Sequence, residues 1–105
     1  MRFHPLEKLM NLRDGYTSRI KIDNLNLLLI QRGEDRYLIE STCPHREHPL
    51  EVASIADGRI QCALHQYQFS LTTGEVLAST EEPCRALRTF ELIYEGNEVG
   101  ILLED

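Results

Sequence analysis

Short stretches of alternating hydrophobic and polar residues recur along the first part of the chain. The alternation predicts β-strands at residues 2–4, 17–22, 25–31 and 36–40. Pro5 is expected to end the first strand, which has the character of an edge strand, and residues 7–11 have too little periodicity to assign. Turns at Asn24 and around Gly33 join the last three strands, so an antiparallel meander is predicted.

The same pattern continues to the end of the sequence. It predicts further strands at residues 59–61, 66–71, 75–77, 87–94 and 99–103, whereas residues 50–55 are ambiguous. Turn-forming pairs separate these strands, with Asp57-Gly58 the strongest hairpin signal. No segment has a convincing helical period, so the sequence predicts an all-β fold, an antiparallel β-sandwich or small barrel.

Length and charge narrow the class of protein. The 105 residues, 42% of them hydrophobic, suit a single domain spanning residues 1–105. Residues 1–40 carry seven basic and six acidic side chains, while residues 41–105 carry four and eleven, which gives the net charge of −6. Such an acidic excess disfavours nucleic acid and anionic lipid, and either serves solubility or steers the protein toward a basic partner.

Neither a membrane anchor nor a secretory signal is expected. The longest apolar run, around Leu25 to Ile30, includes the polar Asn26 and is far shorter than a bilayer span. The first fifteen residues are charged throughout and have no apolar core. A soluble, cytoplasmic protein is therefore predicted.

Two short clips of cysteine and histidine carry the chemistry. The first is Cys43-Pro44-His45 and the second is Cys62-Ala63-Leu64-His65, with residues 46–61 between them. Each clip offers one thiolate and one imidazole, which are ligands for zinc and for iron. The stretch from residue 42 to 73 is thus predicted to be a metal-binding subdomain made of two neighbouring hairpins.

This spacing, followed by an aromatic-rich strand and a Thr-Gly turn, resembles the Rieske-type 2Fe-2S family. The resemblance extends over nearly the whole chain and is greatest to the ferredoxin component of bacterial ring-hydroxylating dioxygenase systems. It implies one 2Fe-2S cluster per chain. In that cluster Cys43 and Cys62 would hold one iron, and His45 and His65 would hold the other.

A cluster with this ligand set has a simple charge balance. Two ferric ions and two sulfides sum to +2, two thiolates cancel this charge, and neutral imidazoles add nothing. Such a centre accepts an electron more readily than one with four thiolates, at roughly −150 to +300 mV instead of about −400 mV. The imidazole-ligated iron is the natural site for the added electron, so electrons are expected to enter and leave at the histidine edge.

Other interpretations of the same residues stay open. A zinc site of two cysteines and two histidines uses the same ligand types, although a zinc finger usually supplies both histidines from one helix. A cysteine nucleophile is disfavoured because no oxyanion or substrate motif accompanies it. Cys84 is expected to be a buried thiol that binds no iron, and His4 and His48 to be surface or loop residues.

The resemblance implies a one-electron carrier rather than an enzyme. Its expected partners are a flavoprotein reductase that uses NAD(P)H and a terminal oxygenase, both bound transiently by a monomer. The alternative is a small subunit held permanently in a larger oxidoreductase, such as an assimilatory nitrite reductase. A zinc-stabilised interaction module is the third possibility.

Some positions depart from the pattern of the family. Where high-potential relatives carry a disulfide and two hydroxyl groups near the cluster, this chain has His48, Leu64, Tyr67 and Phe69. Fewer hydrogen bonds to the sulfurs favour a lower potential. Many relatives have glycine at or near the positions where this chain has Glu47 and Gln66, which leaves the loop conformation and the partner-facing surface open.

Overall fold

A computed structural model describes residues 1–44, 49–50, 53–63, 66–79 and 84–104 of the chain. These residues form eleven β-strands and one short 3-10 helix, so the prediction of an all-β fold is confirmed. Within the described part of the chain, no helix is long and apolar enough to cross a bilayer.

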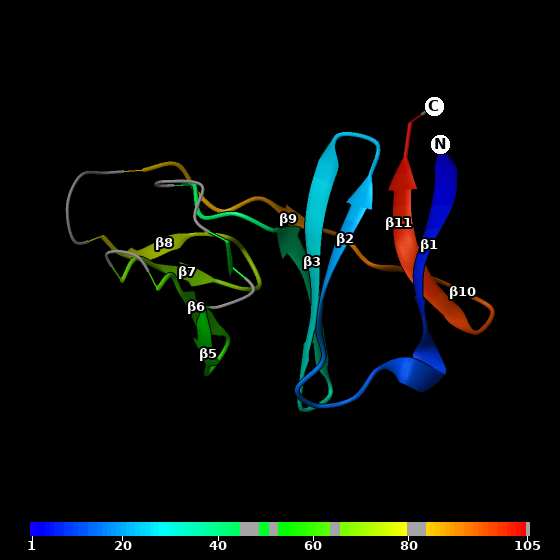
Figure 1. The fold of residues 1–105 in the computed structure, drawn as a ribbon, viewed down its shortest axis with the longest axis horizontal. Helices are drawn as coiled ribbons and strands as arrows, with labels where there is room; N and C mark the ends of the chain where they lie inside the picture. Colours follow the sequence, from blue (N-terminus) through cyan, green and yellow to red (C-terminus); the bar gives the residue numbers. More distant parts are fainter. Residues whose placement is uncertain (45–48, 51–52, 64–65, 80–83, 105) are drawn as a thin grey trace.

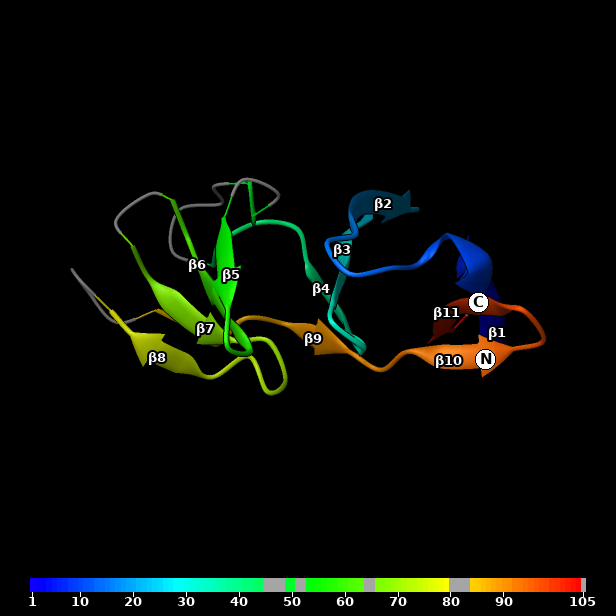
Figure 2. The same cartoon turned by 90° about the horizontal axis from the view of Figure 1, so that it is seen from below.

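The strands form three antiparallel sheets that lie side by side along the long axis of the molecule (Figures 1 and 2). The first sheet has the order β1-β11-β10, the second β2-β3-β4-β9 and the third β5-β6-β7-β8. The strands are β1 (Arg2–Lys8), β2 (Thr17–Ile22), β3 (Leu25–Arg32), β4 (Asp35–Glu40), β5 (Ser54–Ala56), β6 (Arg59–Gln61), β7 (Gln68–Ser70), β8 (Val76–Ala78), β9 (Thr89–Phe90), β10 (Ile93–Glu95) and β11 (Glu98–Leu103), and the 3-10 helix is Leu9–Asn11.

The middle sheet contains the predicted meander and separates two hydrophobic cores. β3 pairs with β2 on one side and with β4 on the other. Side chains alternate across a strand, and accordingly Leu28 and Ile30 join one core while Leu27 and Leu29 join the other. This explains why residues 27–30 are all hydrophobic and all buried instead of alternating in polarity.

The predicted end of the first strand at Pro5 is wrong, because β1 continues to Lys8. β1 is an edge strand, where the missing N–H of proline can face away from the ladder. The strand shifts register between Pro5 and Glu7 and then continues its pairing with β11. The prediction of an edge strand at this end of the chain is confirmed.

The single strand predicted at residues 87–94 is also wrong, because the segment contributes to two different sheets. β9 pairs with β4 in the middle sheet, whereas β10 pairs with β11 in the first. Leu87 precedes both strands and is buried in the core that contains Leu28 and Ile30. A run of hydrophobic residues that crosses between sheets looks like one strand in the sequence, since each sheet buries its own part of the run.

The third sheet is built from consecutive hairpins. Asp57 and Gly58 both have positive φ angles, 52° and 73°, as the predicted hairpin turn between β5 and β6 requires. Of the ambiguous residues 50–55, Ser54 and Ile55 begin β5, and residues 51–52 lie outside the described residues. β7 is shorter than the strand predicted at residues 66–71, and β8 begins one residue later than the strand predicted at residues 75–77. The pairing between β7 and β8 shifts register between Gln68 and Phe69.

Candidate metal centre

The loop that carries Cys43 is closed at its base by backbone pairing. Thr42 and Pro49 form an antiparallel bridge, and the N–H of Leu50 donates a hydrogen bond to the carbonyl of Ser41 at 2.8 Å. Cys43 follows this bridge directly and is fully buried. The first cysteine is therefore fixed by the end of a hydrogen-bonded frame.

The loop that carries Cys62 is the tip of the β6–β7 hairpin. The N–H of Cys62 donates to the carbonyl of Tyr67 at 2.8 Å, and both residues are buried. Gln66 has a φ of 58°, in the left-handed region that favours glycine. The glutamine thus takes the conformation for which glycine is suited, which answers the question that the sequence left open at this position.

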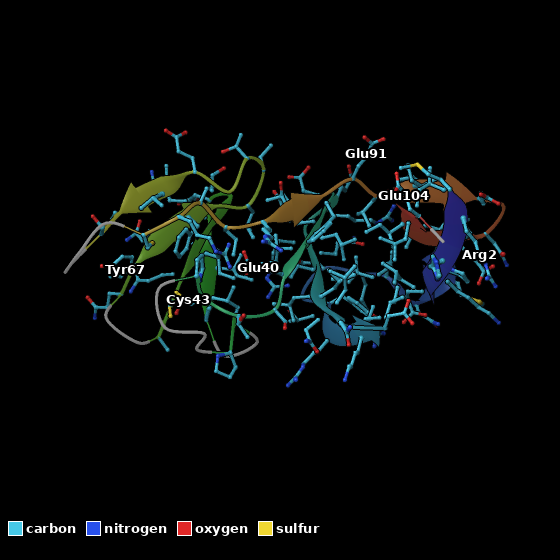
Figure 3. The ribbon with its side chains drawn as sticks, turned by 90° about the horizontal axis from the view of Figure 1, so that it is seen from above. Arg2, Glu40, Cys43, Tyr67, Glu91 and Glu104 are labelled. Carbon is cyan, nitrogen blue, oxygen red and sulfur yellow. The ribbon has the colours of Figure 1, made fainter. Side chains whose placement is uncertain are left out.

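Both cysteines belong to one hydrophobic core. That core comprises Leu28, Ile30, Ile39, Cys43, Leu50, Ile60, Cys62, Tyr67, Phe69, Leu71 and Leu87. The Tyr67 and Phe69 rings lie 6.5 Å apart between centroids and nearly parallel. Figure 3 shows Cys43 and Tyr67 at the same end of the molecule, away from Arg2 and Glu104 at the other end. Two loops thus bring two thiols into one apolar region.

A third segment, residues 84–88, completes the surroundings of these cysteines. Cys84 packs against the same core, and the N–H of Leu87 donates to the carbonyl of Gly74 at 2.8 Å. A β-carbon on Gly74 would lie 1.9 Å from the carbonyl oxygen of Leu87. The segment is therefore pressed against the turn before β8, with no room for a side chain there.

The sequence predicts a buried thiol at Cys84, and the structure places this thiol half-buried against the core. Burial raises the pKa of the Cys84 thiol, and the nearby sulfur of Cys43 raises this pKa further. At neutral pH Cys84 therefore remains a protonated thiol, which is a poor metal ligand. All three cysteines are thiols and not half-cystines.

The structure brings together two of the four predicted ligands. Cys43 and Cys62 lie in the same core, whereas His45 and His65 are outside the described residues, as are His48 and Leu64. Buried thiols from two separate loops fit an iron-sulfur cluster, since thiolates are its usual ligands and an apolar shell keeps water from them. The donor chemistry of the described residues therefore agrees with the predicted cofactor.

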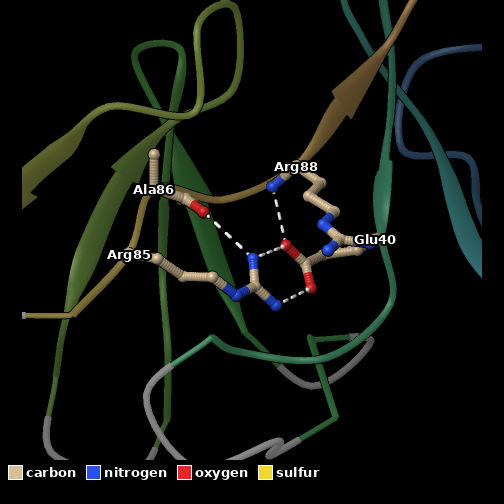
Figure 4. Close-up of polar contacts among 4 residues, drawn as sticks. All are labelled: Glu40, Arg85, Ala86 and Arg88. Atoms are coloured by element: carbon tan, nitrogen blue, oxygen red, sulfur yellow. Dashed lines mark hydrogen bonds and ion pairs between the residues drawn. The ribbon is translucent and has the colours of Figure 1, made fainter.

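Sequence reasoning missed one polar contact beside this site. Glu40, at the end of β4, forms a two-pronged ion pair with Arg85 (Figure 4). This hydrogen bonding raises the pKa of the Arg85 guanidinium above its usual value. Forty-five positions separate the two residues, and no local pattern in the sequence could have shown the pairing.

The chain is similar in sequence to known proteins with a Rieske [2Fe-2S] domain. The sequence profile described as the Rieske [2Fe-2S] domain matches residues 3–91. The ferredoxin component of biphenyl 2,3-dioxygenase from Rhodococcus jostii is 31% identical over 78 residues, which are 74% of this chain and 71% of that protein. Chlorophyllide a oxygenase from Arabidopsis thaliana is 43% identical over 49 residues, but these are only 9% of its length.

Solved structures show the same fold. The ferredoxin of carbazole 1,9a-dioxygenase from Nocardioides aromaticivorans has a TM-score of 0.83 at 22% identity, covering 99% of this chain and 100% of that one. A ferredoxin from Sphingomonas yanoikuyae has a TM-score of 0.84 at 17% identity, with 98% and 100% coverage. The terminal oxygenase of the Nocardioides system also matches, with a TM-score of 0.80, but the match covers 30% of its chain.

Proposed function

Because this chain belongs to the Rieske [2Fe-2S] domain family, we propose that it is a one-electron carrier that passes electrons from a flavoprotein reductase to a terminal oxygenase. Its cofactor is a 2Fe-2S cluster, as in the family. The observation that carries the proposal is the burial of Cys43 and Cys62 in one core, each on a loop closed by a backbone hydrogen bond.

The proposed ligands are Cys43, His45, Cys62 and His65. When bound, the cluster would accept and release one electron. The chain's own residues would give it a rigid, dry setting, because the hydrogen bond from Cys62 to Tyr67 fixes the second loop and the Tyr67 and Phe69 rings exclude water. Phe69 has no hydroxyl that could donate a hydrogen bond to a sulfur of the site. Fewer such hydrogen bonds favour a lower reduction potential within the family range.

The first prediction tests the cofactor and its type. Protein purified without oxygen is expected to hold about two irons and about two acid-labile sulfides per chain, with the visible absorption of an iron-sulfur protein. Iron, sulfide and zinc analysis on one sample gives the answer. A colourless protein with about one zinc per chain would contradict the proposal and favour the zinc-stabilised module.

A carrier of this fold is either a free shuttle or a permanent subunit of a larger enzyme. Similar folds occur in complete ferredoxins and in parts of longer oxygenase chains. Gel filtration of the native protein distinguishes a shuttle from a permanent subunit, such as one of an assimilatory nitrite reductase. We propose the shuttle, a cytoplasmic monomer, which would elute alone near 12.1 kDa.

The second prediction concerns how the carrier meets its partners. Acidic side chains are exposed on the second half of the chain, among them Asp57, Glu75, Glu91 and Glu95. We expect these charges to attract a basic partner surface, so the rate of reduction by the reductase should fall as salt is added. Stopped-flow mixing between about 10 and about 150 mM NaCl covers the range in which the Debye length shrinks from about 30 to about 8 Å.

A matched variant makes this measurement specific. Replacing Glu91 by glutamine removes one exposed charge outside the regular strands and should weaken the salt dependence without changing the cluster content. An unchanged rate across the whole salt range would show that the acidic residues serve solubility only.

A further inference from the structure

Glu40 binds the segment 85–88 through both of its carboxylate oxygens (Figure 4). Arg85 donates from Nη1 to Oε2 and from Nη2 to Oε1, each at 2.7 Å. The backbone N–H of Arg88 donates to the same Oε2 at 2.6 Å. The N–H of Glu40 in turn donates to the carbonyl of Arg88 at 3.0 Å. These four hydrogen bonds join the end of β4 to a segment far away in the sequence.

The position of the Glu40–Arg85 pair connects it to the candidate site. Glu40 lies three residues before Cys43, at the point where the chain enters the first loop. Arg85 directly follows Cys84, which packs against the core that contains Cys43. The pair therefore ties the backbone just before Cys43 to the 84–88 segment.

An ion pair between two exposed side chains contributes little to the stability of a protein. This pair differs because the Glu40 side chain is only 12% exposed, while that of Arg85 is 50% exposed. A carboxylate removed from water needs compensation, and Arg85 and the Arg88 N–H supply it. Loss of Arg85 would leave a mostly buried negative charge close to the cysteine loop.

We propose that Glu40 and Arg85 are positioning residues for the cluster site, which hold the 84–88 segment beside Cys43 and keep the charge there balanced. The proposal rests on the proposed role of Cys43 as a ligand. It assigns two separate tasks to the pair, one mechanical and one electrostatic. Each task has its own measurable consequence.

The electrostatic task gives shifts of opposite sign. When the site takes up one electron from an electrode it gains one negative charge, so a nearby positive charge favours the reduced form. Arg85→Met leaves Glu40 uncompensated and should lower the reduction potential. Glu40→Gln leaves Arg85 uncompensated and should raise it. The double variant should return close to the wild-type potential.

The mechanical task predicts a change in the accessibility of Cys84. When the Glu40–Arg85 pair is removed, the 84–88 segment should separate from the core more often, and alkylation of Cys84 should become about tenfold faster. Arg85→Lys keeps the positive charge but cannot donate two parallel hydrogen bonds. This variant should therefore retain most of the wild-type potential while Cys84 still reacts faster.

The experiment measures both quantities on the purified protein, by voltammetry and by mass spectrometry of the Cys84 peptide after timed alkylation. Arg59→Met is the matched control, because Arg59 is an exposed arginine on β6 and its loss changes the net charge equally. Circular dichroism confirms that each variant is folded. Potential shifts no larger than that of the control, or shifts of the same sign for Arg85→Met and Glu40→Gln, would overturn the electrostatic role.

The failure of this inference can be told apart from failure of the proposed function. If the wild-type protein held no iron and sulfide, the proposed cluster site would be wrong. The alkylation rates would still test whether the Glu40–Arg85 pair holds the 84–88 segment in place. If the cluster were present and Cys84 reacted at the same rate in every variant, the pair would not position the segment.

Discussion

Replacing Cys43 by serine is expected to leave the protein without its cluster. The hydroxyl of serine is a far weaker ligand than a thiolate for iron in an iron-sulfur cluster, and Cys43 is fully buried in the hydrophobic core. Iron content and visible absorption should fall by about tenfold or more relative to the wild type. The same loss is expected for Cys62→Ser, since both thiols lie in one core.

Two controls make this prediction specific to the proposed ligands. Cys84→Ser removes the remaining thiol, which lies at the edge of the same core, and should leave the cluster bound. His48→Ala should also keep it, whereas His45→Ala and His65→Ala should deplete it. A fully loaded, coloured His65→Ala protein would show that the ligand set is not the one proposed.

Replacing Gly74 by alanine is expected to destabilise the protein severely. Gly74 has a φ of 80°, where a residue with a β-carbon costs about 1–2 kcal/mol. The new β-carbon would also lie 1.9 Å from the carbonyl oxygen of Leu87, so the backbone of the 84–88 segment must move. Forcing extra volume into a packed position costs about 1–3 kcal/mol more. The total is a large share of the stability of a small domain, about 5–15 kcal/mol.

Gly58→Ala is the matched control for Gly74→Ala. Gly58 has a similar φ of 73° in the turn between β5 and β6, but a β-carbon there would meet nothing within 4 Å. It should therefore cost only the conformational part, about 1–2 kcal/mol. Chemical denaturation followed by circular dichroism measures both variants. Equal midpoints for the two would show that the contact between Gly74 and Leu87 does not limit the packing.

Strands were predicted best from the sequence where consecutive strands of the chain belong to the same sheet. The meander of β2, β3 and β4 was predicted because each strand is bounded by a turn. The segment 87–94 was predicted as one strand because its hydrophobic residues are contiguous, although Leu87, Phe90 and Ile93 serve different parts of the molecule. Alternation shows that a residue is buried, but not in which core it is buried.

The candidate site shows a similar division between local and distant information. The two clips were recognisable because each one is a short stretch of sequence with the ligands at fixed spacing. The bond between Glu40 and Arg85 joins residues from separate elements, and either charge alone is unremarkable in a protein with 28 charged side chains other than histidine, 11 basic and 17 acidic. Only the fold shows that they meet beside Cys43.

The pairing of β1 with β11 has a consequence for how the chain folds. Arg2 pairs with Leu103, so this sheet joins residues far apart in the sequence, whereas among the described residues β5 to β8 each pair with their neighbours along the chain. Closing a loop of that length costs more entropy than closing a hairpin, and contacts between distant residues slow folding. During synthesis the first strand must wait until residues 98–103 are available. The sheet that carries Cys62 can therefore form while the amino-terminal strand still lacks its partner.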